Sequence, residues 1–97
     1  MVQTICSIQV LTGKKGIIIE KPSRLHRIFF EVRTVADAAP MCVSWISFDD
    51  PLFRSYFIIG GPMKYFKSEG PDIHQGDIWV YNASNGDLTY TATEILH

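Results

Sequence analysis

The sequence predicts an all-β domain, an antiparallel β-sandwich of jelly-roll type with about eight short strands. Three observations lead to this class. Apolar and polar residues alternate with a period of two, no window of a dozen residues carries the apolar stripe of a helix, and turn residues recur every few positions. A small β-barrel is the alternative architecture. With 97 residues and no linker-like stretch, the chain is expected to form one domain, residues 1–97.

The first two strands are expected at residues 2–11 and 17–20. The segment TGKKG at residues 12–16 supplies a turn between them, which predicts a hairpin. An unbroken run of β-branched residues follows the turn: Ile17, Ile18 and Ile19. Such a run suits a strand that is covered on both faces, or one whose second face contacts another subunit.

The third strand is expected at residues 25–34, after the break at Pro22. Its alternation predicts a core face formed by Ile28, Phe30 and Val32. The opposite face is largely polar and carries Arg27, Glu31 and Arg33, with Phe29 among them. Phe29 is therefore either an interface residue or an aromatic ring that a neighbouring loop covers.

The middle of the chain is expected to hold three more strands, at residues 41–48, 55–60 and 64–67. The first of them is apolar on both faces, which indicates a central strand. A turn at residues 49–52 follows it, because Asp side chains and Pro51 favour turns. The longest loop is expected at residues 68–76, which are rich in Gly, Pro and Asp.

The last two strands are expected within residues 76–95, as a hairpin about Asn85-Gly86 in a type I′ turn. That register places the aromatic residues Trp79, Tyr81 and Tyr90 on one face, and Ile78 and Val80 on the other with three threonines. Either face can be the core. The aromatic face is the favoured one, since three large rings in water would leave an apolar patch of several hundred Å², roughly the largest found on monomers.

Composition and charge limit the possible partners. Nine Lys and Arg against ten Asp and Glu give a net charge of −1, which offers no field for binding nucleic acid. The longest uncharged stretch, residues 38–48, is about half of the roughly 20 residues that a membrane-spanning helix needs. Residues 1–10 lack the pattern of a secretory signal. Cys6 and Cys42 form no metal or redox motif and are expected to be reduced and buried.

No arrangement of residues predicts catalysis, a cofactor or a metal ion. Asp72, His74 and Asp77 in the segment PDIHQGD form the best candidate for an acid-base or metal cluster, because imidazole and carboxylate suit Zn²⁺ or Fe²⁺. No second histidine lies nearby in the sequence, so a solvated loop is the favoured interpretation. The pair Asp49 and Asp50 fits a turn better than paired catalytic carboxylates.

Residues 61–96 resemble the C-terminal half of small all-β virion proteins of tailed bacteriophages. The resemblance lies in a Gly/Pro loop, the pattern Gly-x-Ile-Trp-Val, a Ser/Asn/Gly turn and a Thr-rich last strand ending near a Glu. These elements are Gly76, Ile78, Trp79, Val80, the turn at residues 84–87, Thr89, Thr91, Thr93 and Glu94. Upstream, RIFFEV at residues 27–32 resembles an early core strand of such domains.

The resemblance implies a non-enzymatic structural protein of a bacteriophage virion, made in the host cytoplasm. It would decorate or cement the capsid, or form a fibre or tail accessory component, by contacting the major capsid protein or tail proteins. A homo-oligomer is expected, with a trimer favoured. The expected contact residues are Ile17, Ile18, Ile19, Phe29, Phe53 and Tyr56. The alternative is a carbohydrate-binding sandwich in which Trp45 or Trp79 stacks on a sugar.

Overall fold

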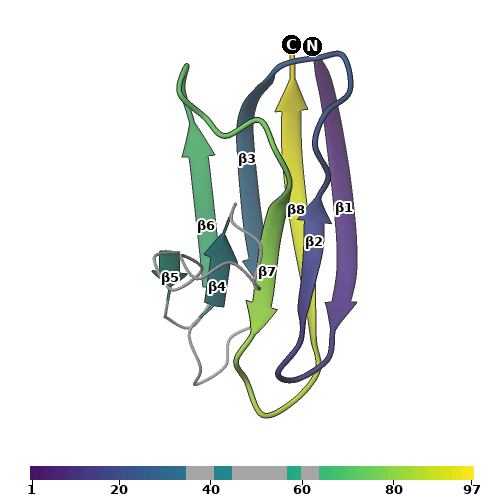
Figure 1. Ribbon diagram of the computed structural model, residues 1–97, viewed down its shortest axis with the longest axis vertical. Coiled ribbons are helices and arrows are strands. Elements are labelled where there is room, and N and C mark those ends of the chain that lie inside the picture. The colour runs from purple at the N-terminus through teal and green to yellow at the C-terminus, as the bar shows by residue number, and fades with distance from the viewer. Residues whose placement is uncertain (35–40, 45–56, 60–63) are drawn as a thin grey trace.

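The computed structural model describes residues 1–34, 41–44, 57–59 and 64–97 (Figure 1). These residues form the strands β1 (Val2–Val10), β2 (Lys15–Ile19), β3 (Arg27–Thr34), β4 (Met41–Ser44), β5 (Phe57–Ile59), β6 (Lys64–Glu69), β7 (Ile78–Asn82) and β8 (Leu88–Leu96). No helix occurs within the described ranges. The predicted all-β class is confirmed. The predicted turn at residues 49–52 lies outside the described residues.

The strands form two antiparallel four-stranded sheets that face each other (Figure 1). One sheet has the order β1-β8-β3-β6, and the other has the order β2-β7-β4-β5. The first and last strands, β1 and β8, are neighbours in the first sheet. Every strand of that sheet is followed or preceded along the chain by a strand of the second sheet. This is the strand order of a jelly roll, in which two Greek keys build an eight-stranded sandwich. The predicted sandwich is confirmed.

The two predicted hairpins are wrong, because each of the two turns connects one sheet to the other. β1 pairs with β8 and β2 pairs with β7, so the turn after β1 crosses between the sheets. β7 and β8 likewise belong to different sheets, so residues 83–87 form a crossing and not a hairpin turn. Asn85 does not have the positive φ that a type I′ turn needs. We call these two connections the arches.

The side chain of Asn82 holds the two arches together. Its Nδ2 donates to the carbonyl oxygens of Val10 and Gly86, each at 2.8 Å. Its Oδ1 accepts from the backbone N–H of Ser84 at 2.9 Å and from the Ser84 hydroxyl at 2.6 Å. Backbone bonds between Asn82 and the first arch, to Gly13 and Lys14, complete the contact. This fully buried amide is satisfied only when both arches are in place, which favours crossings over hairpins.

Neither predicted arrangement of the aromatic residues is correct. Ile78 and Val80 of β7 are fully buried, while Trp79 is half-buried on the outer face. In β8, Tyr90 and Ala92 point inward, each only 1 % exposed. Because β7 and β8 lie in different sheets, each buries its own apolar face, and the predicted register does not exist. The inner faces of both sheets form the core: Val10, Ile18, Ile19, Phe30, Val32, Val43, Ile73, Ile78, Val80, Tyr90 and Ala92.

The predicted faces of the third strand are confirmed for Phe30, Val32 and Arg33 and wrong for Arg27, and Ile28, which was expected in the core, is only half-buried. Phe30 and Val32 are buried, and Arg33 is exposed. Arg27, which was expected on the polar face, is 0 % exposed. The register with β8 shifts between Arg27 and Phe29, so the extra residue Ile28 reverses the side on which Arg27 lies. This bulge turns an arginine into the interior of the sandwich.

Candidate protein interface

Two of the three isoleucines expected at an interface lie in the core. Ile18 and Ile19 are 3 % and 1 % exposed. The pairing of β2 with β7 shifts register between Ile17 and Ile19, so two consecutive residues point inward. The register shift therefore explains why consecutive isoleucines occur in this strand: Ile18 and Ile19 both face the core. Ile17 is half-buried and lies opposite Trp79.

Phe29 lies on the outer face of the sheet that contains β1. It is half-buried and stands between Ile95 of β8 and Glu69 of β6 in the register. The other two expected contact residues, Phe53 and Tyr56, lie outside the described residues. The structure therefore does not bring the expected contact residues together into one described surface.

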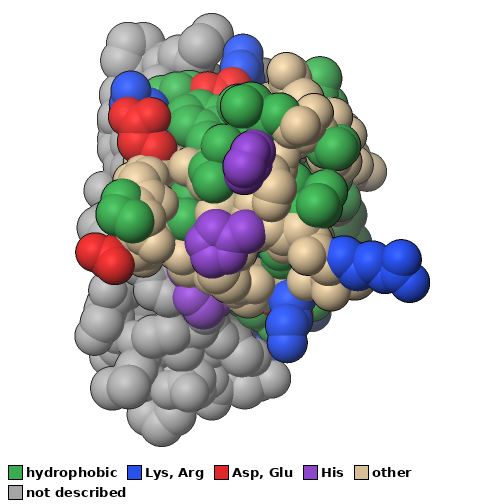
Figure 2. Space-filling view, turned by 90° about the horizontal axis from the view of Figure 1, so that it is seen from above, with side chains coloured by type: hydrophobic (Ala, Val, Ile, Leu, Met, Phe, Trp, Pro, Cys, Tyr) green, Lys and Arg blue, Asp and Glu red, His purple; other side chains and the backbone are tan. Residues whose placement is uncertain are grey.

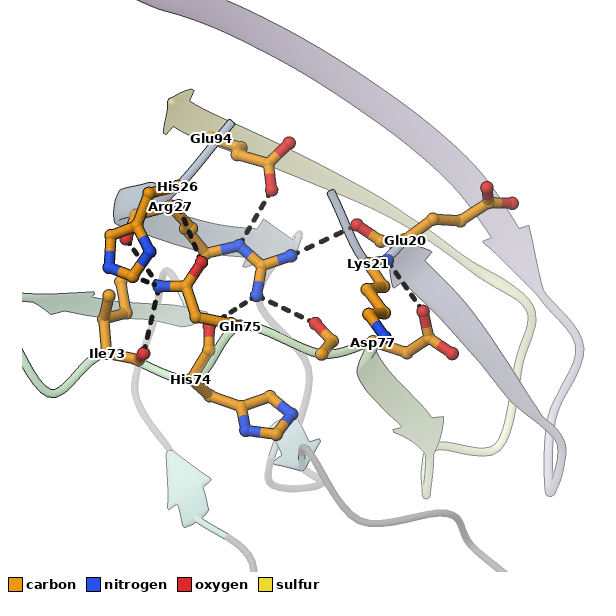
Figure 3. A network of polar contacts seen from close by, with 10 residues as sticks. Glu20, Lys21, His26, Arg27, Ile73, His74, Gln75, Asp77 and Glu94 are labelled. Carbon is orange, nitrogen blue, oxygen red and sulfur yellow. Dashed lines mark hydrogen bonds and ion pairs between the residues drawn. The ribbon is translucent and has the colours of Figure 1, made fainter. Parts of the chain in front are cut away.

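The buried Arg27 is the centre of a polar network that sequence reasoning missed (Figure 3). Its Nε donates to Glu94 Oε2 at 2.8 Å, and both side chains are almost completely buried. Its Nη1 donates to the backbone carbonyls of His74 at 2.6 Å and Gly76 at 2.8 Å, and its Nη2 donates to the carbonyl of Glu20 at 3.2 Å. The network thus joins β3 and β8 to the loop before β7 and to the end of β2.

Gln75 fixes the same loop to the backbone of Arg27. The Arg27 N–H donates to Gln75 Oε1, and Gln75 Nε2 donates to the Arg27 carbonyl, each at 2.7 Å. The network lies at the end of the sandwich that carries both termini. Figure 2 looks onto this end, where histidine side chains gather among hydrophobic ones. His26 and His97 pair through their backbones there, at 2.8 and 3.0 Å.

The segment with Asp72, His74 and Asp77 has structural contacts. Asp72 is exposed, whereas Asp77 Oδ1 accepts from the Lys21 N–H at 2.7 Å. Burial, together with the nearby charge of Arg27, lowers the pKa of His74. Within the described ranges, no three His, Cys, Asp or Glu side chains are placed to hold a metal ion.

A groove of about 600 Å³ opens along the flank of the sandwich, between the edge strands β1 and β2. Its walls combine apolar side chains with a few polar ones: Thr4, Cys6, Ile8, Ile17, Ile18, Ile19, Glu20, Lys21, Pro22, Ser23, Glu94 and Leu96. Glu94, the partner of Arg27, is one of these lining residues. Burial raises the pKa of the Cys6 thiol, and the carboxylates of Glu94 and Glu20 raise it further. The thiol is therefore protonated at neutral pH, and a protonated thiol is a poor nucleophile.

Two of the four sheet edges, β2 and β6, carry described features that discourage pairing with another chain. Natural proteins protect edges with charged residues, short strands and bulges. β6 has the sequence KYFKSE, in which Lys67 and Glu69 are exposed. β2 begins with a lysine and contains the irregularity at Ile17 to Ile19, whereas β5 is described only over Phe57–Ile59.

The fourth edge, β1, has none of these features. Its sequence is VQTICSIQV, nine residues without a charge, a proline or a glycine. All nine residues pair with β8 in an uninterrupted register, from Val2 opposite Leu96 to Val10 opposite Leu88. Among the described strands, β1 has a hydrogen-bonded neighbour on one side only (Figure 1). It therefore presents a long, uninterrupted row of backbone groups suited to pairing with a further strand.

The side chains of β1 add an apolar component to this edge. Ile5 is 66 % exposed on the outer face, and Val2 is 46 % exposed. The lack of charge in residues 2–10 is visible in the sequence, but the edge position of the strand is not. The sequence alone therefore shows an uncharged strand but does not identify it as an interface.

Comparisons with known proteins add no further assignment. No protein-family model, curated protein or solved structure matches this chain. In the described part of the chain, no helical segment has the length and apolar character to span a lipid bilayer.

Proposed function

We propose that this protein is a non-enzymatic structural protein that works by assembly, as a decorating, cementing or fibre and tail accessory component of a bacteriophage virion. The observation that supports an assembly role best is the unprotected edge of β1. The edges of β2 and β6 carry charged residues or a bulge, whereas the edge of β1 has neither. An edge that is left open in this way is suited to a partner strand.

The jelly-roll order is compatible with this role but does not select it. Jelly rolls occur in viral capsid proteins, in lectins and in cupins, and a fold alone does not define a function. The direction toward a virion comes from the sequence resemblance in residues 61–96. Most of its motif residues lie in β7 and β8, the strands next to the two edges that flank the groove.

Assembly would also add stability to a small domain. A chain of this size buries only about 60 to 65 % of its unfolded surface, so its own core is modest. Each further 100 Å² of apolar surface that is buried between copies contributes about 2.5 kcal/mol before the costs of association. The proposed partners are other copies of this chain and the major capsid protein or tail proteins.

The structure offers no specific support for the carbohydrate-binding alternative. Trp45 lies outside the described residues. Trp79 is half-buried, and the Nζ of Lys15 lies over its ring, 5.6 Å from the centroid. A sugar that stacked on this face would have to displace the lysine, so we do not propose sugar binding.

The virion role is tested by measuring whether the protein is part of purified particles. Quantitative mass spectrometry of particles made from the genome that encodes this chain should find it in many copies per particle. Purified protein should also sediment together with particles that lack it. A protein that is absent from particles and does not sediment with them would contradict the virion role, whatever its oligomeric state.

A further inference from the structure

The sequence of β1 is nearly the same when it is read backwards. In an antiparallel pair of two β1 strands with full overlap, Val2 lies opposite Val10 and Gln3 lies opposite Gln9. Thr4 then lies opposite Ile8, which is also β-branched, and Cys6 lies opposite Cys6 of the second copy. The outer pair, Ile5 opposite Ser7, is the larger of the two mismatches in size. A strand with this symmetry is complementary to itself.

The faces of β1 fit the same register. Cys6, Ile8 and Val10 are the half-buried and buried residues of the strand, and they point toward the interior of the sandwich. Gln3, Ile5, Ser7 and Gln9 are exposed. Opposite residues of an antiparallel pair share a face of the sheet. Full overlap places even-numbered residues opposite even-numbered ones, so the inner and outer faces of two copies continue without a break.

We propose that two copies of this protein pair through β1, antiparallel and with full overlap, about a two-fold axis at Cys6. The sheet β1-β8-β3-β6 then continues into its copy and becomes an eight-stranded sheet. The backbone groups on the open side of β1 gain partners, and the exposed side chain of Ile5 packs beside Ser7 of the second copy. The inner residues Thr4, Cys6 and Ile8 of the second copy extend the wall of the groove.

A second copy fits this edge better than another partner for two reasons. Pairing of β1 with itself brings no charge opposite a like charge, because the strand has none. The contact is also isologous, so it uses the open edge of both copies and closes at two. The edges of β2 and β6 carry charged residues or a bulge and do not extend it further. The expected closed homo-oligomer would thus be a dimer, in place of the trimer that the resemblance implies.

The inference deepens the proposed assembly role, but its test needs only the purified protein and is independent of particles. Light scattering coupled to size-exclusion chromatography should give twice the 11.0 kDa mass of the chain. The variant I5K/S7K places a lysine of one copy opposite a lysine of the other on both sides of the two-fold axis, and should give the monomer mass. The variant I5K/S7E places a lysine opposite a glutamate at the same positions and should keep the dimer mass.

Both substituted positions are exposed in the single chain, so the two variants should fold alike, which circular dichroism checks. They differ only in the sign of the charge at position 7, which makes the comparison specific for this register. A monomeric wild-type protein would overturn the proposal. A dimer that both variants keep, or that both lose while folded, would overturn it as well, since the contact would then lie elsewhere or in another register.

The thiol at the two-fold axis provides a second test. Opposite residues in an antiparallel pair have Cα atoms about 4.5 to 5.5 Å apart, which lies within the range that a disulfide spans. With copper-phenanthroline and dissolved oxygen as oxidant, two Cys6 thiols lose two protons and two electrons and form a disulfide. C42S protein should therefore give a covalent dimer at alkaline pH, and C6S protein should not. If C42S protein stays uncrosslinked while it has the dimer mass, the proposed register is wrong.

Discussion

The buried pair of Arg27 and Glu94 allows a sharp prediction about stability. Replacing Arg27 with methionine keeps much of the apolar stem but removes the guanidinium, which donates to Glu94 and to three carbonyls. The side chain of Glu94 is only 7 % exposed, so its charge would be left buried without the arginine. Breaking a buried ion pair in this way costs about 3 to 5 kcal/mol.

This loss is a large part of the roughly 5 to 15 kcal/mol that stabilises a typical domain. For a chain of this size, each kcal/mol lowers Tm by about 4 to 8 °C, so Arg27→Met should lower Tm by about 12 °C or more. Urea unfolding monitored by circular dichroism measures the free energy, and calorimetry measures Tm. Glu94→Gln keeps an acceptor for Nε but removes the charge, and should cost about 1.5 to 3 kcal/mol.

The matched control is Arg33→Met, the same substitution six residues further along β3. The Arg33 side chain is 49 % exposed and pairs with Glu31 at the surface, and such pairs contribute about 0 to 1 kcal/mol. The double variant R27M/E94M should lose less than the sum of its single variants, because no unpaired charge remains. If Arg27→Met costs no more than Arg33→Met, the network does not hold the end of the sandwich as described.

Three further predictions concern the arches and His74. Asn82→Ala leaves buried groups of both arches without partners, and should cost at least about 1 to 3 kcal/mol in urea unfolding; a loss below that range would mean that Asn82 does not hold the arches together. Gly13→Ala should destabilise by more than about 1 kcal/mol, because Gly13 has a φ of 72°, whereas Gly86→Ala, with open space and no positive φ, should be neutral or stabilising. Equal effects of the two alanines would contradict this. The pKa of His74 is lower in the folded state than the value of 6.5 expected when unfolded, so the unfolded state binds more protons and stability should fall as pH drops through about 6.5. The variant H74Q should reduce the dependence of the unfolding free energy on pH in this range. An unchanged dependence would mean that other groups cause it.

The sequence was sufficient to predict the class of fold but not the pairing of its strands. Alternation and turn residues identify strands, yet the same turn residues serve hairpins and crossings between sheets. A signal against the last hairpin was present. A hairpin about Asn85-Gly86 places Val80 opposite Thr91, on the face away from Tyr90, so both faces of the hairpin would be partly apolar. Two strands in different sheets bury both Val80 and Tyr90, as the structure shows.

The polar network and the edge were out of reach for related reasons. The alternation of apolar and polar residues in this strand places Arg27 on the exposed face, and only the bulge at Ile28 turns its side chain inward. A bulge depends on the partner strand, which local patterns do not specify. The uncharged sequence of β1 could be read directly, but its place at the edge follows from the order of all the strands. The candidate interface could therefore be identified only from the structure.

The pairing of β1 with β8 also has a consequence for how the chain is made. β1 leaves the ribosome long before β8, so it can reach this partner only after the strands between them have been translated, and the sandwich cannot close step by step during synthesis. Contacts between such distant segments slow folding, and unpaired strands are prone to aggregate meanwhile. Nascent β1, uncharged and still unpaired, is thus open to contacts with other chains until β8 arrives.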